Sequence, residues 1–232
     1  MTAGQLRGNR GRAALLAALL TGFALVLLAV ELRWGPLHRL DLRIVDDLHR
    51  SALHHPGAVT WWLWVSRVLN PTVERIAYGV VVVLLMMARR WSTALFVAAT
   101  MIGEAVLDSA TKAIVGRHRP SFVHPVAHAA GAAFPSGHAL GATVSFGLLV
   151  LLVPRRWKPA AAILAVLATG LVSFSRLALG VHFLSDVVAG WLLGGAWLAL
   201  MAWCAAAGLF TLRSPRAPAQ PASDPPRGTP TR

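Results

Sequence analysis

Long apolar runs separated by short polar segments dominate the chain, and this pattern predicts membrane-crossing helices. Six runs can be marked, each close to the ~20 residues that a helix needs to cross hydrocarbon. They lie at 13–32, 71–88, 91–111, 137–153, 158–175 and 184–207. The first run follows three arginines, but it is longer than the ~7–15 apolar residues of a signal peptide, so we interpret it as a retained helix. The pattern therefore predicts an all-α integral membrane bundle of about six transmembrane helices.

The composition agrees with a membrane protein. Hydrophobic residues make up 56% of the 232 residues and charged residues only 13%, whereas a soluble domain has about 25% charged residues. The net charge of +13 taken alone is also typical of nucleic-acid-binding proteins. The basic residues, however, gather in short clusters between the apolar runs, as they do in cytoplasmic loops. We therefore expect the lipid bilayer, and no nucleic acid, as a partner; the sequence indicates no oligomeric state.

The basic clusters predict an orientation. With both termini in the cytoplasm, the clusters at 7–12, 89–90, 155–158 and 213–216 all fall inside. We expect a cytoplasmic N-terminus over 1–12, a membrane-embedded domain over 13–212 and a disordered, basic, proline-rich cytoplasmic tail over 213–232. The tail has too little apolar surface to fold. In this topology the polar segments within 112–186 lie at extracytoplasmic helix ends.

Residues 33–70 have a different character. Aspartates, histidines and arginines are interleaved there and are followed by Trp61, Trp62 and Trp64. Tryptophan prefers the headgroup region, and 56–69 has the length and apolarity of a helix that lies at the surface or dips into it. We prefer, however, to interpret the segment as a plain connecting loop with aromatic anchors and no role at the substrate. The adjacent His54 and His55 would diverge on a helix and lack a matching Cys/His cluster, so we expect no metal.

Three polar motifs interrupt the later apolar runs. The first is Lys112-x6-Arg119-Pro120, the second is Pro135-Ser136-Gly137-His138, and the third is Ser175-Arg176-x5-His182-x3-Asp186. The cations Lys112, Arg119 and Arg176 fit a phosphate, because an arginine fork binds two phosphate oxygens and a lysine acts as a mobile point charge. Phosphoryl transfer needs such positioned donors around its equatorial oxygens.

The second motif precedes an apolar run, so its backbone N–H groups lie at a helix start, which favours an anion. Ser136 adds a hydroxyl donor, and Gly137 lets the backbone approach a phosphate closely. His138 is then suited to protonate a leaving group, because histidine titrates near neutrality. His182 and Asp186 are one helical turn apart, so the carboxylate can hold one imidazole nitrogen while the other attacks phosphorus.

In these three motifs the chain resembles the type 2 phosphatidic acid phosphatase family, and every position of that signature is filled. The resemblance covers Lys112 to Asp186 and the six-helix pattern. It implies that His182 forms a phosphoenzyme, that Asp186 orients it, and that His138 is the general acid. It also implies that phosphate is bound by Lys112, Arg119, Ser136, Gly137 and Arg176, without a metal or another cofactor.

Glu104, Asp108 and Lys112 recur at four-residue spacing near the end of one predicted span. Charges at this depth are costly and are usually paired or functional. We expect Asp108 to pair with Lys112 rather than to act in catalysis.

The sequence thus predicts a membrane phosphatase that acts on a lipid phosphate or lipid diphosphate at the extracytoplasmic face. The motifs recognise the phosphate and leave the lipid tail open. Transfer of the phosphoryl group to another lipid is a close variant. A non-catalytic transporter or scaffold with a phosphate-binding vestibule is the alternative from another class, and the presence of both histidines argues against it. Vanadate-dependent halide oxidation is a more remote alternative.

Overall fold

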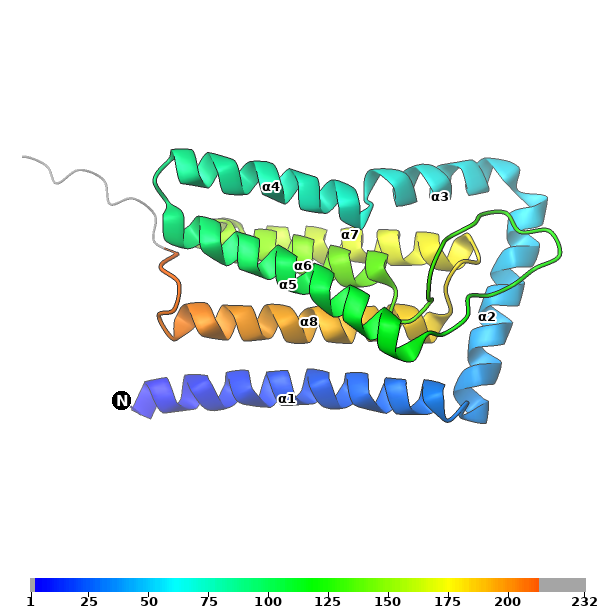
Figure 1. Ribbon diagram of the computed structural model, residues 1–232, viewed down its shortest axis with the longest axis horizontal. Coiled ribbons are helices and arrows are strands. Elements are labelled where there is room, and N and C mark those ends of the chain that lie inside the picture. The colour runs from blue at the N-terminus through cyan, green and yellow to red at the C-terminus, as the bar shows by residue number, and fades with distance from the viewer. Residues whose placement is uncertain (1–2, 213–232) are drawn as a thin grey trace, which may run out of the picture.

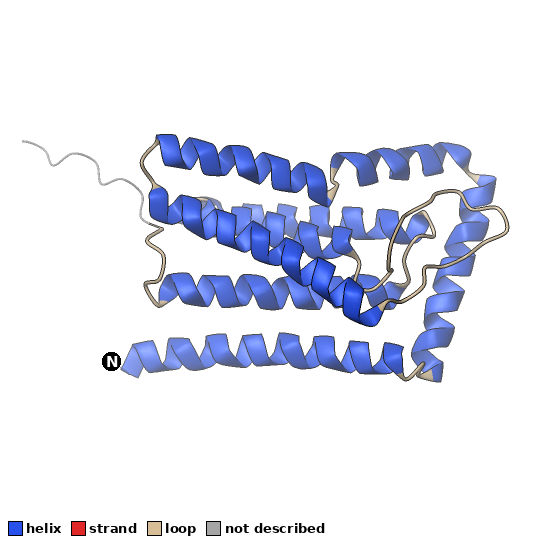
Figure 2. Ribbon diagram, viewed as in Figure 1, coloured by secondary structure: helices blue, strands red, loops and turns tan. Residues whose placement is uncertain are grey.

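The computed structural model describes residues 3–212, which form an α-helical bundle without β-strands (Figures 1 and 2). The elements are α1 (Ala3–Glu31), α2 (Gly35–His54), α3 (Pro56–Val68), α4 (Pro71–Met87), α5 (Trp91–Val115), α6 (Gly137–Leu152), the 3-10 helix η1 (Arg155–Trp157), α7 (Lys158–Ala178) and α8 (Leu184–Ala206). The all-α prediction is confirmed. The tail predicted over 213–232 lies outside the described residues.

Five segments are long and apolar enough to cross a membrane: Gly8–Glu31, Pro56–Met87, Trp91–Val115, Arg155–Ala178 and Leu184–Ala206. The remaining predicted span is the shorter apolar helix α6, which has 16 residues. At ~1.5 Å per residue it covers about 24 Å, less than the ~30 Å of hydrocarbon. Because α5, α7 and α8 pack around α6, it is surrounded largely by protein rather than lipid.

The segment between the first two predicted spans is helical, so its interpretation as a connecting loop is wrong. Helix α2 lies across one end of the bundle, and α3 runs in the direction of α4 (Figure 1). Asp41, Val45 and His49 recur every four residues on α2 and are buried, where the helix packs on α7 and α8. Helix α3 packs against α7. This segment is therefore part of the packed domain and not only a connection.

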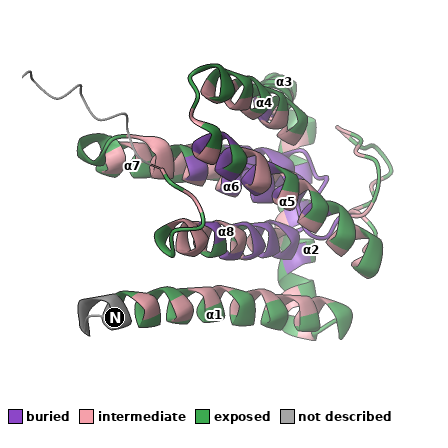
Figure 3. Cartoon of the chain, turned by 60° about the vertical axis from the view of Figure 1, so that its left-hand side comes forward, coloured by how far each residue is buried: buried purple, intermediate pink, exposed green. Residues whose placement is uncertain are grey.

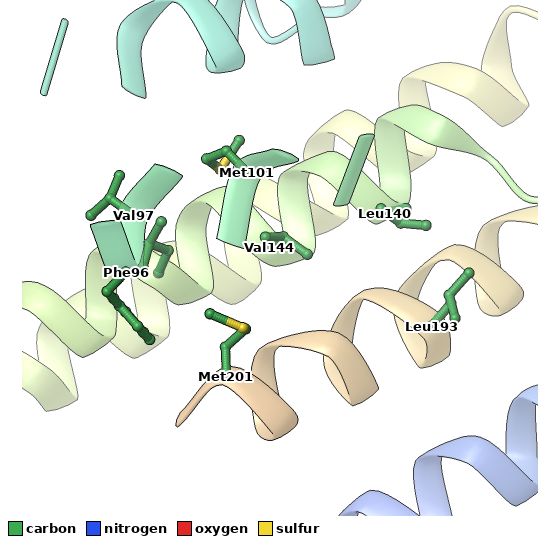
Figure 4. Packing of buried hydrophobic residues seen from close by; sticks show 8 residues of the cluster. Phe96, Val97, Met101, Leu140, Val144, Leu193 and Met201 are labelled. Atoms are coloured by element: carbon green, nitrogen blue, oxygen red, sulfur yellow. The ribbon is translucent and has the colours of Figure 1, made fainter. Parts of the chain in front are cut away.

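The core lies between α5, α6 and α8, where buried residues concentrate (Figure 3). Its side chains include Phe96, Val97, Met101, Leu140, Val144, Leu193 and Met201 (Figure 4). Close approach of α6 and α8 depends on small residues, as is common between membrane helices. A Cβ at Gly190 would meet the carbonyl oxygen of Ser136 at 2.8 Å. This contact places the start of α8 directly against the start of α6.

Several helix ends meet at the end of the bundle that α2 crosses. Helix α5 stops where Gly116 adopts a φ of +59°, and the turn after α7 contains Gly180 with a φ of +64°. Glycine adopts this left-handed conformation without the strain that a Cβ would add. The short turn between α7 and α8 and the loop between α5 and α6 consequently carry the three motifs to the same place.

Candidate active site

A cavity of about 250 Å³ lies where these helix ends meet. Six of the eight predicted site residues line it: Lys112, Arg119, Gly137, His138, Arg176 and His182. The other two, Ser136 and Asp186, are fully buried beside it, and the Ser136 N–H donates to the Asp186 carbonyl at 2.9 Å. The structure therefore brings all three motifs together. Further lining residues are Asn70, Pro71, Thr72, Arg75, Asp108, Ala129 and Ala130.

His182 is held between a cation and a carboxylate. Its Nε2 lies 2.9 Å from Nη1 of Arg119, and its Nδ1 lies 3.5 Å from Oδ2 of Asp186. An arginine can only donate, so Nε2 accepts and the ring proton resides on Nδ1, facing the carboxylate. In this tautomer the lone pair is on Nε2, the nitrogen at the cavity, where it accepts from Arg119; a nucleophile requires this neutral form.

His182 and Asp186 do not lie one turn apart on the same helix, as we expected from their spacing. His182 precedes α8, whose first residue is Leu184, and Phe183 has an extended backbone with ψ of 160°. The Asp186 carboxylate caps the helix start, because its Oδ2 accepts from the Phe183 N–H at 2.9 Å. The same oxygen lies 3.5 Å from Nδ1 of His182, so the start of α8 positions the carboxylate beside the ring.

Burial lowers the pKa of His182 to about 4, although its interaction with Asp186 acts in the opposite direction. The side chain is only 2% exposed, and removing it from water disfavours the charged ring. His182 is therefore neutral at pH 7. Burial also lowers the pKa of Arg119, with Asp186 and Asp108 opposing the change.

Arg117 and Asp41, which the motif analysis did not select, support Asp186. Arg117 donates to Oδ1 of Asp186 at 2.5 Å and to Oδ2 of Asp41 at 2.9 Å. Asp41 also accepts from the backbone N–H of Ser185 at 2.9 Å and from its hydroxyl at 2.5 Å. Asp41 is 1% exposed, so α2 contributes a buried carboxylate to the support of the α8 start.

Ser66 of α3 contacts two motif residues and was also missed. Its backbone carbonyl lies 3.2 Å from Nε2 of His138, and its hydroxyl accepts a hydrogen bond from Nη1 of Arg176. Because a carbonyl only accepts, Nε2 of His138 carries a hydrogen, and Nδ1 is the nitrogen that can exchange a proton with a bound group. A single serine thereby fixes both the ring and the guanidinium.

The predicted pairing of Lys112 with Asp108 is confirmed, with Nζ 2.8 Å from Oδ2. Glu104 instead pairs with Arg75 of α4 through two contacts of 3.1 Å. A Cβ at Gly137 would meet Lys112 Nζ at 2.8 Å and the Asp108 carboxylate at 3.0 Å. Glycine at this position consequently lets the lysine and its partner reach the start of α6.

Besides Nδ1 of His182, which lies 3.5 Å from Oδ2 of Asp186, two buried donors at the site have no hydrogen-bond partner among the described residues: the Ser136 hydroxyl and Nε of Arg176. Ser136 is the N-cap residue of α6, yet its side chain does not cap the helix. Leaving a buried polar group without a partner costs about 1–3 kcal/mol, so such groups indicate a role beyond packing. With Lys112 and Arg119 they form a set of donors suited to an oxyanion. Within residues 3–212, no cluster of three or more His, Cys, Asp or Glu side chains could hold a metal ion.

The apolar bundle defines an integral membrane protein, and the cationic, histidine-containing cavity is a candidate site for an oxyanion. The family model of the PAP2 superfamily matches residues 91–208, and the chain belongs to that superfamily. The match includes all three motifs and excludes α1 to α4. Asp41, Ser66 and Arg75 therefore come from the part of the chain that the family model does not cover.

Two of the curated proteins to which the chain is similar match it over less than half of its length. The chain is 38% identical over 112 residues to an undecaprenyl-diphosphatase from Sulfolobus acidocaldarius, covering 46% of this chain and 49% of the relative. It is 32% identical over 97 residues to a phosphatidylglycerophosphatase B from Bacillus subtilis, covering 39% of this chain and 47% of the relative. The chain thus spans about half the length of these relatives.

The fold is similar to a crystal structure of a transmembrane PAP2-type phosphatidylglycerolphosphate phosphatase from Bacillus subtilis. The TM-score is 0.74 at 20% sequence identity, and the superposition covers 83% of this chain and 96% of the other. At this identity the likeness concerns the fold alone.

Proposed function

We propose that this protein is an integral membrane phosphatase that hydrolyses a lipid phosphate or lipid diphosphate through a phosphohistidine intermediate. The observation that carries the proposal is the neutral, buried His182, whose Nε2 faces Arg119 at 2.9 Å within a cavity lined by three motif cations. A nucleophile needs its lone pair directed at the place where the phosphoryl group binds. The family membership and the names of the relatives are consistent with this chemistry.

In the first step, Nε2 of His182 forms a bond to phosphorus while the bond from phosphorus to the leaving oxygen breaks. The electron pair stays on that oxygen. It takes the Nδ1 proton of His138 in its imidazolium form, which leaves a neutral His138 with its hydrogen on Nε2. Lys112, Arg119, Arg176 and the Ser136 hydroxyl stabilise the phosphoryl oxygens. In the second step, water attacks phosphorus, the bond from phosphorus to Nε2 of His182 breaks, and the water gives a proton to Nδ1 of His138, which restores the imidazolium. Inorganic phosphate leaves and His182 is free again.

A groove beside the cavity supports a lipid substrate. It has a volume of about 800 Å³, lies between α4 and α5, and is lined mostly by apolar or small residues such as Val82, Met101, Ile102 and Val106. Arg75 lines both the groove and the cavity. A headgroup bound at His182 can therefore continue into an acyl or prenyl chain along the groove.

We propose that the cavity opens on the extracytoplasmic side. The basic residues Arg89 and Arg90 lie between α4 and α5. Arg155 and Arg156 lie in η1, between α6 and α7, and Lys158 begins α7. The motifs occupy the opposite ends of α5, α6 and α7. The positive-inside rule favours placing these arginines and Lys158 in the cytoplasm, which leaves the cavity on the other face.

Phosphate release by the purified protein tests the function. Phosphatidic acid, phosphatidylglycerol phosphate and polyprenyl diphosphate should be assayed in detergent micelles with chelator present. We expect release from at least one of them by the wild type, inhibition by vanadate, and no release by His182→Ala. Undiminished activity in His182→Ala would refute the mechanism. A protein that binds these lipids with no turnover would instead be a binding module.

A further inference from the structure

The cavity holds one cation that the three motifs do not supply. Arg75 lies in the first turns of α4, outside the matched region 91–208, and lines the cavity together with Lys112, Arg119 and Arg176. It also lines the apolar groove between α4 and α5. A substrate with its phosphoryl group at His182 and its tail in the groove must therefore pass this guanidinium.

The volume of the cavity exceeds the need of one phosphate. Its 250 Å³ is many times the roughly 10–15 Å³ that a cavity needs to hold one water molecule. A phosphate monoester headgroup fills only part of this space, whereas a diphosphate has nearly twice the heavy atoms. Space for a second phosphate is thus available within reach of the side chains that line the cavity.

The guanidinium of Arg75 is oriented by a buried partner and retains free donors. Its Nε and Nη2 bind the two carboxylate oxygens of Glu104, each at 3.1 Å, and the Glu104 side chain is 1% exposed. Nη1 has no hydrogen bond to any residue of the described part of the chain. An arginine fixed along one edge presents its remaining N–H groups in a defined direction, which suits phosphate recognition.

From these observations we propose that Arg75 is a specificity-determining residue that binds the second phosphate of a lipid diphosphate. This inference rests on the proposed phosphatase function. When Nε2 of His182 bonds to the terminal phosphorus, the bond to the bridging oxygen breaks, and the electron pair remains on the departing lipid monophosphate. Arg75 stabilises the charge that develops on this group, while His138 supplies its proton. When the substrate is a lipid monophosphate, the leaving group is the lipid alcohol, which has no phosphate for Arg75 to bind.

Two substrates with one tail test the assignment: farnesyl diphosphate and farnesyl monophosphate in detergent micelles. Arg75→Gln should raise KM for the diphosphate about 10- to 100-fold, the range for one charge-assisted contact. The KM for the monophosphate should change less than about 3-fold. Arg75→Lys keeps the positive charge but loses the planar guanidinium. Its KM for the diphosphate should lie between those of the wild type and Arg75→Gln. The exposed Arg67→Gln on α3 is the matched control and should resemble the wild type.

Glu104→Gln separates substrate recognition from packing. If Arg75 only neutralised Glu104, the variants Arg75→Gln and Glu104→Gln would each lower turnover of the diphosphate and of the monophosphate to the same extent. Equal losses on both substrates in Arg75→Gln, or no loss on either, would overturn the proposal. So would a wild type that cleaves the monophosphate alone, although the phosphatase function would then stand.

Binding of inorganic pyrophosphate and inorganic phosphate, measured by calorimetry, tests Arg75 without turnover. The wild type should prefer pyrophosphate, and Arg75→Gln should lose that preference. Lack of a preference in the wild type counts against the proposal. A preference that depends on Arg75 in a protein without hydrolytic activity would refute the phosphatase function but retain the Arg75 site.

Discussion

His182 combines a low pKa with a directed lone pair, and both properties come from its surroundings. Burial disfavours the imidazolium, and Arg119 at Nε2 makes protonation of that nitrogen less favourable still. Asp186 lies 3.5 Å from Nδ1, on the side of the ring that carries the proton. His138 has a different environment, because the Ser66 carbonyl fixes its Nε2. Two histidines in one cavity are thereby suited to two tasks, attack and proton transfer.

The two histidines should fail in different ways. His182→Ala removes the attacking nitrogen and should abolish the phosphoenzyme. His138→Ala should slow the release of a lipid alcohol by about 10²- to 10⁴-fold. It should spare much of the first step with an activated aryl phosphate, whose leaving group needs no proton. Rapid quench with labelled aryl phosphate should consequently trap phosphoenzyme in His138→Ala only. Equal labelling of both variants would contradict the assignment of His182 as nucleophile.

The pKa of His182 also predicts how stability depends on pH. An unfolded histidine titrates near ~6.5, whereas folding lowers the pKa of His182 to about 4. Between these values the unfolded chain binds more protons, so this contribution to stability is complete above pH ~6.5 and is lost as the pH falls towards 4. The melting temperature of the wild type in detergent should therefore fall more between pH 7 and 4.5 than that of His182→Gln. His124→Gln, a change at an exposed histidine, is the control and should show the same fall in melting temperature as the wild type. If the melting temperature of His182→Gln falls as much as that of the wild type, the effect is disproved.

Helix α2 shows how a segment outside the motifs takes part in the site. Its buried residues Asp41, Val45 and His49 form one face, and Asp41 on this face binds both Arg117 and Ser185. Arg117 in turn binds Asp186. The orientation of the carboxylate beside His182 consequently depends on a helix far away in sequence.

Replacing Asp41 by Asn should slow phosphoenzyme formation about 10-fold, since one charge-assisted hydrogen bond contributes about 1.5–3 kcal/mol. The reason is that Arg117 loses its second anionic partner and no longer fixes Asp186. Single-turnover rates with an aryl phosphate measure this step. Asp46→Asn, an exposed change on the same helix, is the matched control. A change in KM with an unaltered single-turnover rate would place the role of Asp41 elsewhere.

Most of the helices could be predicted from the sequence because apolar runs determine where a chain can cross a membrane. The predicted run 71–88 became α4 over Pro71–Met87, and 184–207 became α8 over Leu184–Ala206. The motifs identified the residues that meet in the cavity. The supporting partners were missed, because Asp41, Ser66 and Arg75 depend on which helices become neighbours. A signal for Asp41 was present, since an acid shared a four-residue repeat with Val45.

The bundle separates its charges along its length. The motif cations and their carboxylate partners lie at the end crossed by α2, and the clusters at 89–90 and 155–158 lie at the other end. The proposed orientation rests on this arrangement, because the positive-inside rule favours basic loops in the cytoplasm. The side on which the cavity opens decides which leaflet supplies the substrate.

Cysteine labelling in intact cells tests this orientation, starting from a Cys204→Ser background. Val123→Cys lies in the loop between α5 and α6, where Val123 is 90% exposed, and Ala88→Cys lies in the turn between α4 and α5. Because the basic residues beside Ala88 favour the cytoplasm, a membrane-impermeant maleimide should label Val123→Cys in intact cells. It should label Ala88→Cys only after the cells are permeabilised. The two cysteines lie at opposite ends of the bundle, so each serves as the control for the other. The reverse pattern would place the cavity at the cytoplasmic face, and the substrate would then come from the inner leaflet.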